Sequence, residues 1–214
     1  MFEIGKIRFR PFGREDISLL EKWENDYEVT LYARGKPLVF KNTDNLEKEY
    51  EEYLKDEDKQ RFILEMVKDD KTLGIATYKG HSDSVKNADI GVYIGEKEYW
   101  NQGIGKDITL GLCEMLLFHK NYDRLSAWSS SLNKRAHKVL EEFGFVKTGV
   151  ARKSGYLLGN RIDWLMFDLL KEEYMTNRQE LLDKHLDDKE KYLRNYCKLK
   201  VPKKYIENKK QNDE

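Results

Sequence analysis

Residues 88–106 read ADIGVYIGEKEYWNQGIGK, which is an apolar strand over 88–94, a charged turn, and two glycines that open a helix. Apolar residues at helical spacing extend that helix to about His119. Glycine lets a backbone approach a ligand closely, and the first turn of a helix offers unpaired N–H groups and a positive dipole end. Because Lys106 adds a full charge nearby, this strand–turn–helix unit suits a phosphate group.

Two common nucleotide motifs do not fit this unit. A Walker loop requires a glycine five residues before Gly105, where Trp100 stands. A dinucleotide fingerprint requires a glycine three residues after Gly105, where Ile108 stands. Taken alone, the two glycines therefore leave two interpretations open: a phosphate-binding loop, and a helix start with incidental glycines.

The elements on either side of this unit indicate a layered α+β (α/β) fold. The second half of the chain alternates strand, helix, strand, helix and strand, which is typical of a mixed sheet covered by helices. Periodicity predicts strands at 6–12, 61–68, 72–78, 124–129, 145–151 and 161–169, and helices from about 15, at 44–58 and at 133–142.

Composition excludes several classes of protein. The 214 residues carry 39 basic and 39 acidic side chains, so there is no global attraction to nucleic acid or to an anionic membrane. Apolar runs are far shorter than a membrane span. Two distant cysteines are typical of a reduced, cytoplasmic protein. The four histidines are scattered outside any metal-binding spacing, so no metal site is expected.

The run over 88–94, followed by YWNQGIGK at 99–106, resembles the acetyl-CoA-binding motif of the GNAT N-acetyltransferases. It is closest to the branch typified by ribosomal-protein N-terminal acetyltransferases. The resemblance covers about residues 5–175. Three further stretches agree with that branch in order and spacing, namely IRFRPF at 7–12 with Asp16 and Trp23, NKRA at 133–136 with EEFGF at 141–145, and GNRID at 159–163 with EEY at 172–174.

The resemblance implies a mostly antiparallel mixed sheet flanked by helices, in which the parallel strands 88–94 and 124–129 splay apart to admit acetyl-CoA. The cofactor's pantetheine arm would pair with the backbone of the first of these strands, and its pyrophosphate would lie at the glycine-bearing helix start. The residues expected to bind the cofactor are Val92, Tyr93, Ile94, Gln102, Gly103, Ile104, Gly105, Lys106 and Asn133.

The implied chemistry is attack of a neutral primary amine on a thioester, which a base assists. Asp89 stands where related enzymes often have a carboxylate and is our candidate base, against the alternative of a strand-end acid that faces solvent. A backbone N–H near Val92 or Tyr93 would polarise the thioester oxygen. Leu140 occupies the position of the tyrosine that many GNAT enzymes use as general acid, and Asn101 stands where the branch has glycine.

The acceptor is expected to be a protein N-terminus, with a small polyamine or an amino-sugar as alternatives. A non-catalytic acyl-CoA-binding or interaction module on the same fold is the competing function. Residues 1–175 would form the acetyltransferase domain and 176–214 a charged helical extension with a frayed tail from 202. That extension packs either on the domain or in a homodimer.

Overall fold

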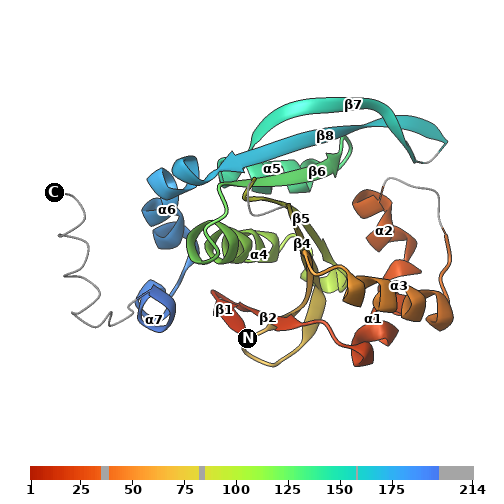
Figure 1. Cartoon of the computed structure of the whole chain (residues 1–214), viewed down its shortest axis with the longest axis horizontal. Coiled ribbons are helices and arrows are strands. Elements are labelled where there is room, and N and C mark those ends of the chain that lie inside the picture. Colours follow the sequence, from red (N-terminus) through yellow and green to blue (C-terminus); the bar gives the residue numbers. More distant parts are fainter. Residues whose placement is uncertain (35–38, 82–84, 158, 198–214) are drawn as a thin grey trace.

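The computed structural model describes residues 1–34, 39–81, 85–157 and 159–197. Within them, eight strands form one sheet in the order β1-β2-β3-β4-β5-β6-β8-β7 (Figure 1). All neighbours are antiparallel except β5 and β6, which confirms the predicted fold class. The strands are β1 (Phe2–Ile4), β2 (Ile7–Pro11), β3 (Lys59–Met66), β4 (Thr72–His81), β5 (Asn87–Ile94), β6 (Arg124–Ser130), β7 (Val146–Leu157) and β8 (Asn160–Leu170).

Helices cover both faces of the sheet. Neighbouring residues on β3 show the division, because Ile63 is buried in one apolar cluster and Leu64 in the other. The first cluster lies under α1–α3, and the second under α4–α7. The helices are α1 (Ile17–Glu24), α2 (Tyr27–Arg34), α3 (Thr43–Lys55), α4 (Ile104–Cys113), α5 (Lys134–Glu142), α6 (Lys171–His185) and α7 (Lys189–Tyr192).

Periodicity located most of these elements, but not the first strand. The three-residue strand β1 is too short to show an alternation, and it forms by pairing with β2. The helix expected to reach His119 does so, although its last part, Glu114–His119, is π-helical. The strand predicted at 145–151 is longer than expected, because β7 continues to Leu157 beside β8.

The predicted boundary after residue 175 falls inside α6, and the helices that follow pack on the core. Leu182 and Tyr192 are buried there, so the described part of the extension lies on the domain itself. The tail predicted from residue 202 falls outside the described residues. None of the helices in the described ranges is both long and apolar enough to cross a bilayer.

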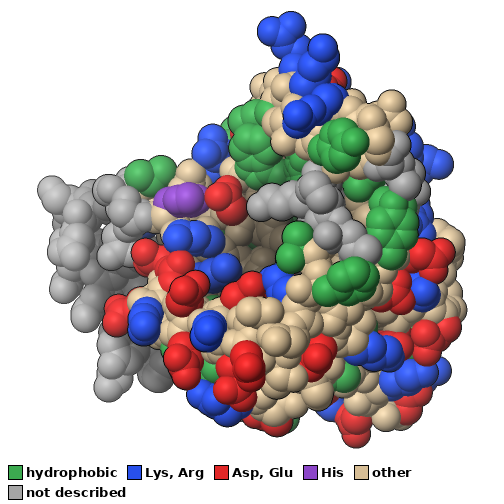
Figure 2. All heavy atoms as spheres, turned by 90° about the vertical axis from the view of Figure 1, so that its right-hand side faces the viewer, with side chains coloured by type: hydrophobic (Ala, Val, Ile, Leu, Met, Phe, Trp, Pro, Cys, Tyr) green, Lys and Arg blue, Asp and Glu red, His purple; other side chains and the backbone are tan. Residues whose placement is uncertain are grey.

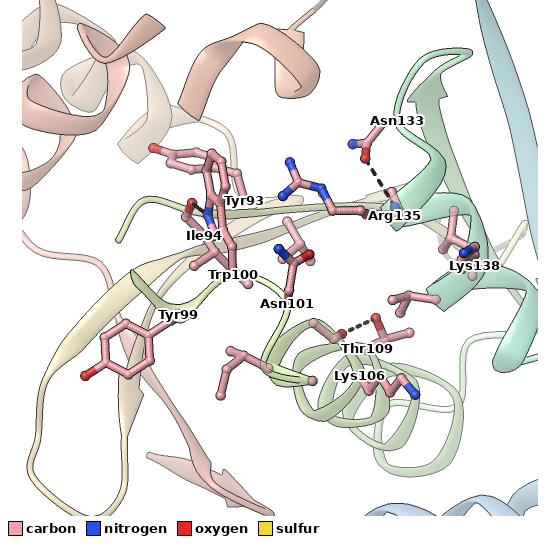
Figure 3. Close-up of a pocket in the computed structure, with 18 of the residues that line it drawn as sticks. Tyr93, Ile94, Tyr99, Trp100, Asn101, Lys106, Thr109, Asn133, Arg135 and Lys138 are labelled. Carbon is pink, nitrogen blue, oxygen red and sulfur yellow. Dashed lines mark hydrogen bonds between the residues drawn. The ribbon is translucent and has the colours of Figure 1, made fainter. Parts of the chain in front are cut away.

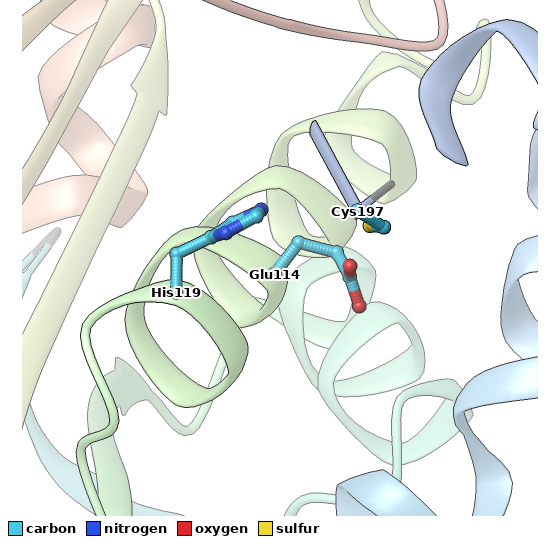
Figure 4. Close-up of side chains that lie close together, drawn as sticks. All are labelled: Glu114, His119 and Cys197. Carbon is cyan, nitrogen blue, oxygen red and sulfur yellow. The ribbon is translucent and has the colours of Figure 1, made fainter. Parts of the chain in front are cut away.

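A fully buried carboxylate, Glu114, fastens the extension to the sheet domain. It accepts hydrogen bonds from Arg178 Nε and Nη2, both at 2.7 Å, and from Tyr192 Oη at 2.5 Å. Its neighbours His119 and Cys197 place potential ligand atoms within 4.8 Å of one another (Figure 4). Because both Glu114 oxygens already accept charged or phenolic donors, we assign this group a structural role rather than metal binding.

Candidate active site

The two central parallel strands separate halfway along their length. Pairing between β5 and β6 ends at Ile90 and Ala127, yet β5 continues to Ile94 and β6 to Ser130. A pocket of about 530 Å³ lies at this divergence, between β5, the start of α4, and α5 (Figure 3). This is the splayed geometry that the resemblance implies.

The backbone of β5 presents alternate residues to the opening. Gly95 N–H donates to Leu73 O at 2.8 Å, which makes these two residues a hydrogen-bonded pair in the β4–β5 ladder. Because hydrogen-bonded and non-hydrogen-bonded pairs alternate, Tyr93 also directs its backbone groups to β4. The backbone groups of Val92 and Ile94 therefore point to the side that β6 has left. There Trp100 Nε1 donates to Ile94 O at 2.9 Å.

The start of α4 supplies further backbone donors. Gly103 precedes the helix with a φ of 82°, which glycine adopts without strain. Lys106 N–H bonds to Gly103 O at 2.8 Å, whereas the N–H groups of Ile104 and Gly105 have no partner among the described residues. Asn101 has a φ of 61°, a left-handed conformation that asparagine tolerates better than most residues. A glycine at this position would adopt the same conformation without strain.

Cations and one carboxylate lie on different walls of the pocket. Lys106 on α4 and Arg135 and Lys138 on α5 line it from the helical face that carries α4. Glu28, on α2 at the opposite face of the sheet, is the one acidic side chain among the described lining residues. It is ion-paired to Lys97 at 2.7 Å. The pocket wall therefore carries three cationic side chains on one side of the sheet and one carboxylate on the other.

Helix α5 presents an amide to the pocket where many related enzymes would also present a phenol. Asn133 caps the helix through its side-chain oxygen, which accepts from Ala136 N–H at 3.2 Å. Its side-chain amide nitrogen remains available to a ligand. Leu140, further along the same helix, lines the pocket where those enzymes have a tyrosine, so α5 offers no phenol there. The tyrosines that do line the pocket are Tyr93 and Tyr99.

The structure brings together most of the residues predicted to bind the cofactor. The pocket is lined by Val92, Tyr93, Ile94, Gly103, Ile104, Gly105, Lys106 and Asn133. Gln102 is exposed and does not line the pocket; its side chain donates to Glu98 O. Sequence reasoning missed Glu28, Arg135 and Lys138. Spacing on α5 from Asn133 could have indicated the two cations, but only the folded chain brings α2 to the pocket.

Asp89 lies outside the pocket lining. It belongs to β5, on the same face as Tyr93, and its carboxylate is about half exposed. Asp89 Oδ2 is 3.0 Å from His81 Nε2 on the neighbouring strand. The described residues thus place this carboxylate beside an imidazole rather than beside the pocket wall.

A sequence model described as the acetyltransferase (GNAT) domain matches residues 6–146. The chain belongs to the GNAT family. The chain is also 26% identical over 171 residues to an uncharacterized N-acetyltransferase, p20, of Bacillus licheniformis, with 79% of this chain and 95% of the relative covered. A prophage-derived uncharacterized N-acetyltransferase of Bacillus subtilis, YokL, is 23% identical over 80% of this chain and 93% of its own length.

A solved GNAT structure shares the fold. It is the spermidine N-acetyltransferase of Vibrio cholerae in complex with CoA and spermine, with a TM-score of 0.73, 18% sequence identity, and coverage of 79% of this chain and 98% of that one. This GNAT protein is therefore an acetyl-CoA-dependent N-acetyltransferase, as the sequence predicts. Family membership favours an enzyme over a non-catalytic acyl-CoA-binding module. Assignment to the branch of ribosomal-protein N-terminal acetyltransferases stays a prediction.

Proposed function

We propose that the pocket between β5 and α5 binds acetyl-CoA and delivers its acetyl group to the α-amine of a peptide. The observation that carries this proposal is the divergence of β5 and β6 beside the first turn of α4, where two backbone N–H groups lack a partner among the described residues. A strand edge can pair with the amides of a pantetheine arm, and a helix start attracts its diphosphate. The two features meet in one pocket.

The chain's own groups account for binding and polarisation. The N–H groups of Ile104 and Gly105 take phosphate oxygens, with Arg135 adding charge. The Val92 N–H donates to the thioester oxygen, because the alternation in the ladder turns Val92, and not Tyr93, to the opening. Acetyl-CoA supplies an activated acyl carbon, at which the amine nitrogen forms the new bond while the carbon–sulfur bond breaks and the sulfur leaves as thiolate.

The proton chemistry favours an α-amine as acceptor. The attacking nitrogen must be neutral, and an α-amino group has a pKa of about 8, against about 10.4 for a lysine-like amine. A useful fraction of α-amine is therefore neutral near pH 7 without a strong base. Asp89 remains our candidate to take the proton released on attack; it would act through water, since neither Asp89 nor its neighbour His81 lines the pocket.

The charge on the acceptor side also favours a monocation. Glu28 is the one carboxylate among the described pocket residues, and Lys97 already neutralises part of it. A polyamine carries several charges and would gain from several carboxylates. The surrounding surface suits a peptide, because the hollow on one face of the molecule has hydrophobic side chains along part of its rim and charged side chains along the rest (Figure 2). Trp128 and Tyr156 are among the exposed aromatic residues, at 49% and 42%.

The test is an acceptor screen at saturating acetyl-CoA, with acetylated products identified by mass spectrometry. The panel holds short peptides with free N-termini, the same peptides blocked at the α-amine but containing lysine, spermidine, spermine and an amino-sugar. Faster turnover of free N-termini supports the proposal. Faster turnover of a polyamine would replace the acceptor while leaving the cofactor site in place. Absence of saturable acetyl-CoA binding by calorimetry would overturn the cofactor site itself.

A further inference from the structure

Three helices meet at one carboxylate beside the proposed diphosphate site. Glu142 is the last residue of α5, and its side chain is only 19% exposed. Its Oε2 lies 2.9 Å from Lys106 Nζ of α4, and its Oε1 lies 2.9 Å from Lys184 Nζ of α6. His185, also on α6, approaches Oε1 to 3.4 Å through Nε2. The cluster joins the cofactor loop to the C-terminal extension.

A carboxylate in this place depends on its cations. The C-terminal end of a helix is the negative end of its dipole, so Glu142 stands where an acid is disfavoured. Burial alone would raise the pKa of Glu142, but hydrogen bonds from Lys184 and Lys106 hold it below its ordinary value. The carboxylate is therefore ionised at neutral pH, and its negative charge offsets part of the positive charge of the two lysines.

The number of cations around Glu142 decides how much positive charge remains to attract a ligand. Burial lowers the pKa of His185, which is therefore neutral at physiological pH and adds no charge. Lys106 and Lys184 together outweigh Glu142 by one positive charge. Without Lys184, Lys106 and Glu142 would form a one-to-one pair, and the Lys106 ammonium would be neutralised before any phosphate arrived. Lys106 lines the pocket, so this excess charge lies at the pocket wall.

We propose that Lys184 is a positioning residue for cofactor binding: it neutralises Glu142 and so leaves Lys106 free to bind a phosphate of acetyl-CoA. Lys184 belongs to the extension, beyond residue 146, where the match to the family ends. The inference rests on the proposed cofactor site and adds to it a contribution from a segment outside the matched domain. It also gives the extension a part in the reaction besides packing.

The test compares two acyl donors, of which only one carries phosphate. Acetyl-CoA carries a diphosphate and a 3′-phosphoadenosine, whereas acetyl-pantetheine carries the same thioester and lacks both groups. The variant Lys184→Gln should raise the KM for acetyl-CoA about three- to fivefold at low salt, the range expected for one partly exposed ion pair. It should leave kcat and the KM for acetyl-pantetheine unchanged. The difference should shrink as ionic strength rises.

Two further variants separate this role from damage to the fold. Lys189→Gln removes another ion-paired lysine of the extension, whose partner is Asp183, and should leave both KM values unchanged. Lys184→Gln combined with Glu142→Gln removes both charges, frees Lys106 again, and should restore the KM for acetyl-CoA to within about twofold of the wild-type value. Lys184→Arg should also restore it, because the charge is kept.

The outcomes are distinct for the two proposals. Wild-type enzyme that uses acetyl-pantetheine as well as acetyl-CoA would mean that the loop binds no phosphate, and the proposed cofactor site would fail. If the wild-type enzyme prefers acetyl-CoA but Lys184→Gln and Lys189→Gln have the same KM for acetyl-CoA, only the role of Lys184 would be overturned. A loss shared by both donors and not restored in the double variant would overturn it as well.

Discussion

Arg135 extends from α5 to Trp100, so that its guanidinium carbon lies 4.7 Å from the centre of the indole ring (Figure 3). The two residues come from opposite walls of the pocket, one from α5 and the other from the segment between β5 and α4. A guanidinium over an indole face is held by a cation–π interaction, which is modest where water has access. Arg135 therefore stands at the pocket wall, where a guanidinium can meet an anionic ligand.

We expect Arg135→Gln to weaken acetyl-CoA binding about five- to tenfold, because a charge-assisted bond to phosphate is lost. Calorimetric titration of the two proteins measures the change. Lys134→Gln is the matched control, since it removes the preceding cation of the same helix, which does not line the pocket. Equal affinity of the Arg135 and Lys134 variants would show that the guanidinium takes no part in binding.

Gly105→Ala should separate stability from binding. An added Cβ would lie 3.9 Å from Val139 Cγ2, an ordinary contact, and alanine favours a helix over glycine by up to about 1 kcal/mol. The fold should therefore be as stable or slightly more stable, while the methyl group narrows the pocket next to the phosphate donors and weakens acetyl-CoA binding. Thermal unfolding and calorimetry on one preparation measure both. Lower stability together with unchanged affinity would contradict the assignment of Gly105 to the site.

Local patterns predicted most of the residues on one side of the pocket, because they belong to one continuous piece of chain. The strand that ends at Ile94, the turn, and the glycines before Lys106 lie within twenty residues, and their periods of two and 3.6 are visible in the sequence. The same patterns could not place Glu28 or Lys184. Glu28 reaches the pocket, and Lys184 reaches Glu142 beside it, because helices distant in sequence pack there. Helix periodicity indicates only which face of a helix is buried, and not what that face packs against.

The position of Asp89 shows a second limit of sequence reasoning. Alternation correctly put this residue on β5, but the face on which its side chain lies and its pairing with His81 follow from the register of β4 against β5. Register depends on turn geometry and on the pattern of burial across strands, neither of which a single strand reveals. The predicted base thus stays a prediction to be tested by kinetics.

Asp89→Asn should lower kcat about tenfold at pH 7. This loss is smaller than that expected for a base in direct contact with the amine, because the carboxylate acts through water and the amine is already partly neutral. The loss should diminish toward pH 9, where the amine is neutral without help. Rates over this pH range with a peptide acceptor measure the effect. A rate equal to wild type throughout would identify Asp89 as a solvent-facing acid of the strand.

Glu28→Gln should act on the acceptor rather than on acetyl-CoA. Loss of the one carboxylate among the described pocket residues removes attraction for the protonated amine, so the KM for the peptide should rise about threefold, within the range of a single exposed charge. The KM for acetyl-CoA should stay constant. Glu47→Gln, on the outer face of α3, is the control, because Glu47 pairs with Arg14 away from the pocket. A larger effect on acetyl-CoA than on the peptide would place the acceptor elsewhere.

Asp107 on α4 should make the fold less stable at high pH. This side chain is only 9% exposed, and burial raises its pKa to about 6, with Lys6 opposing and Asp187 adding to the shift. In the unfolded chain a carboxyl group has a pKa of about 3.9. Between pH 4 and pH 6 the unfolded chain therefore ionises first, so the cost of the buried charge grows with pH and is constant above about pH 6.

Removing the charge should remove that cost. Asp107→Asn should raise the free energy of unfolding at pH 8 by about 1–2 kcal/mol, a value reduced from the full shift because the carboxyl is partly solvated and the dipole of α4 favours an acid near its start. At pH 4 the variant should match the wild type, since Asp107 is then neutral in the folded protein. Urea unfolding at the two pH values measures the difference, with the exposed Glu57→Gln as control. A gain of equal size at both pH values would mean that packing, rather than ionisation, distinguishes asparagine from aspartate here.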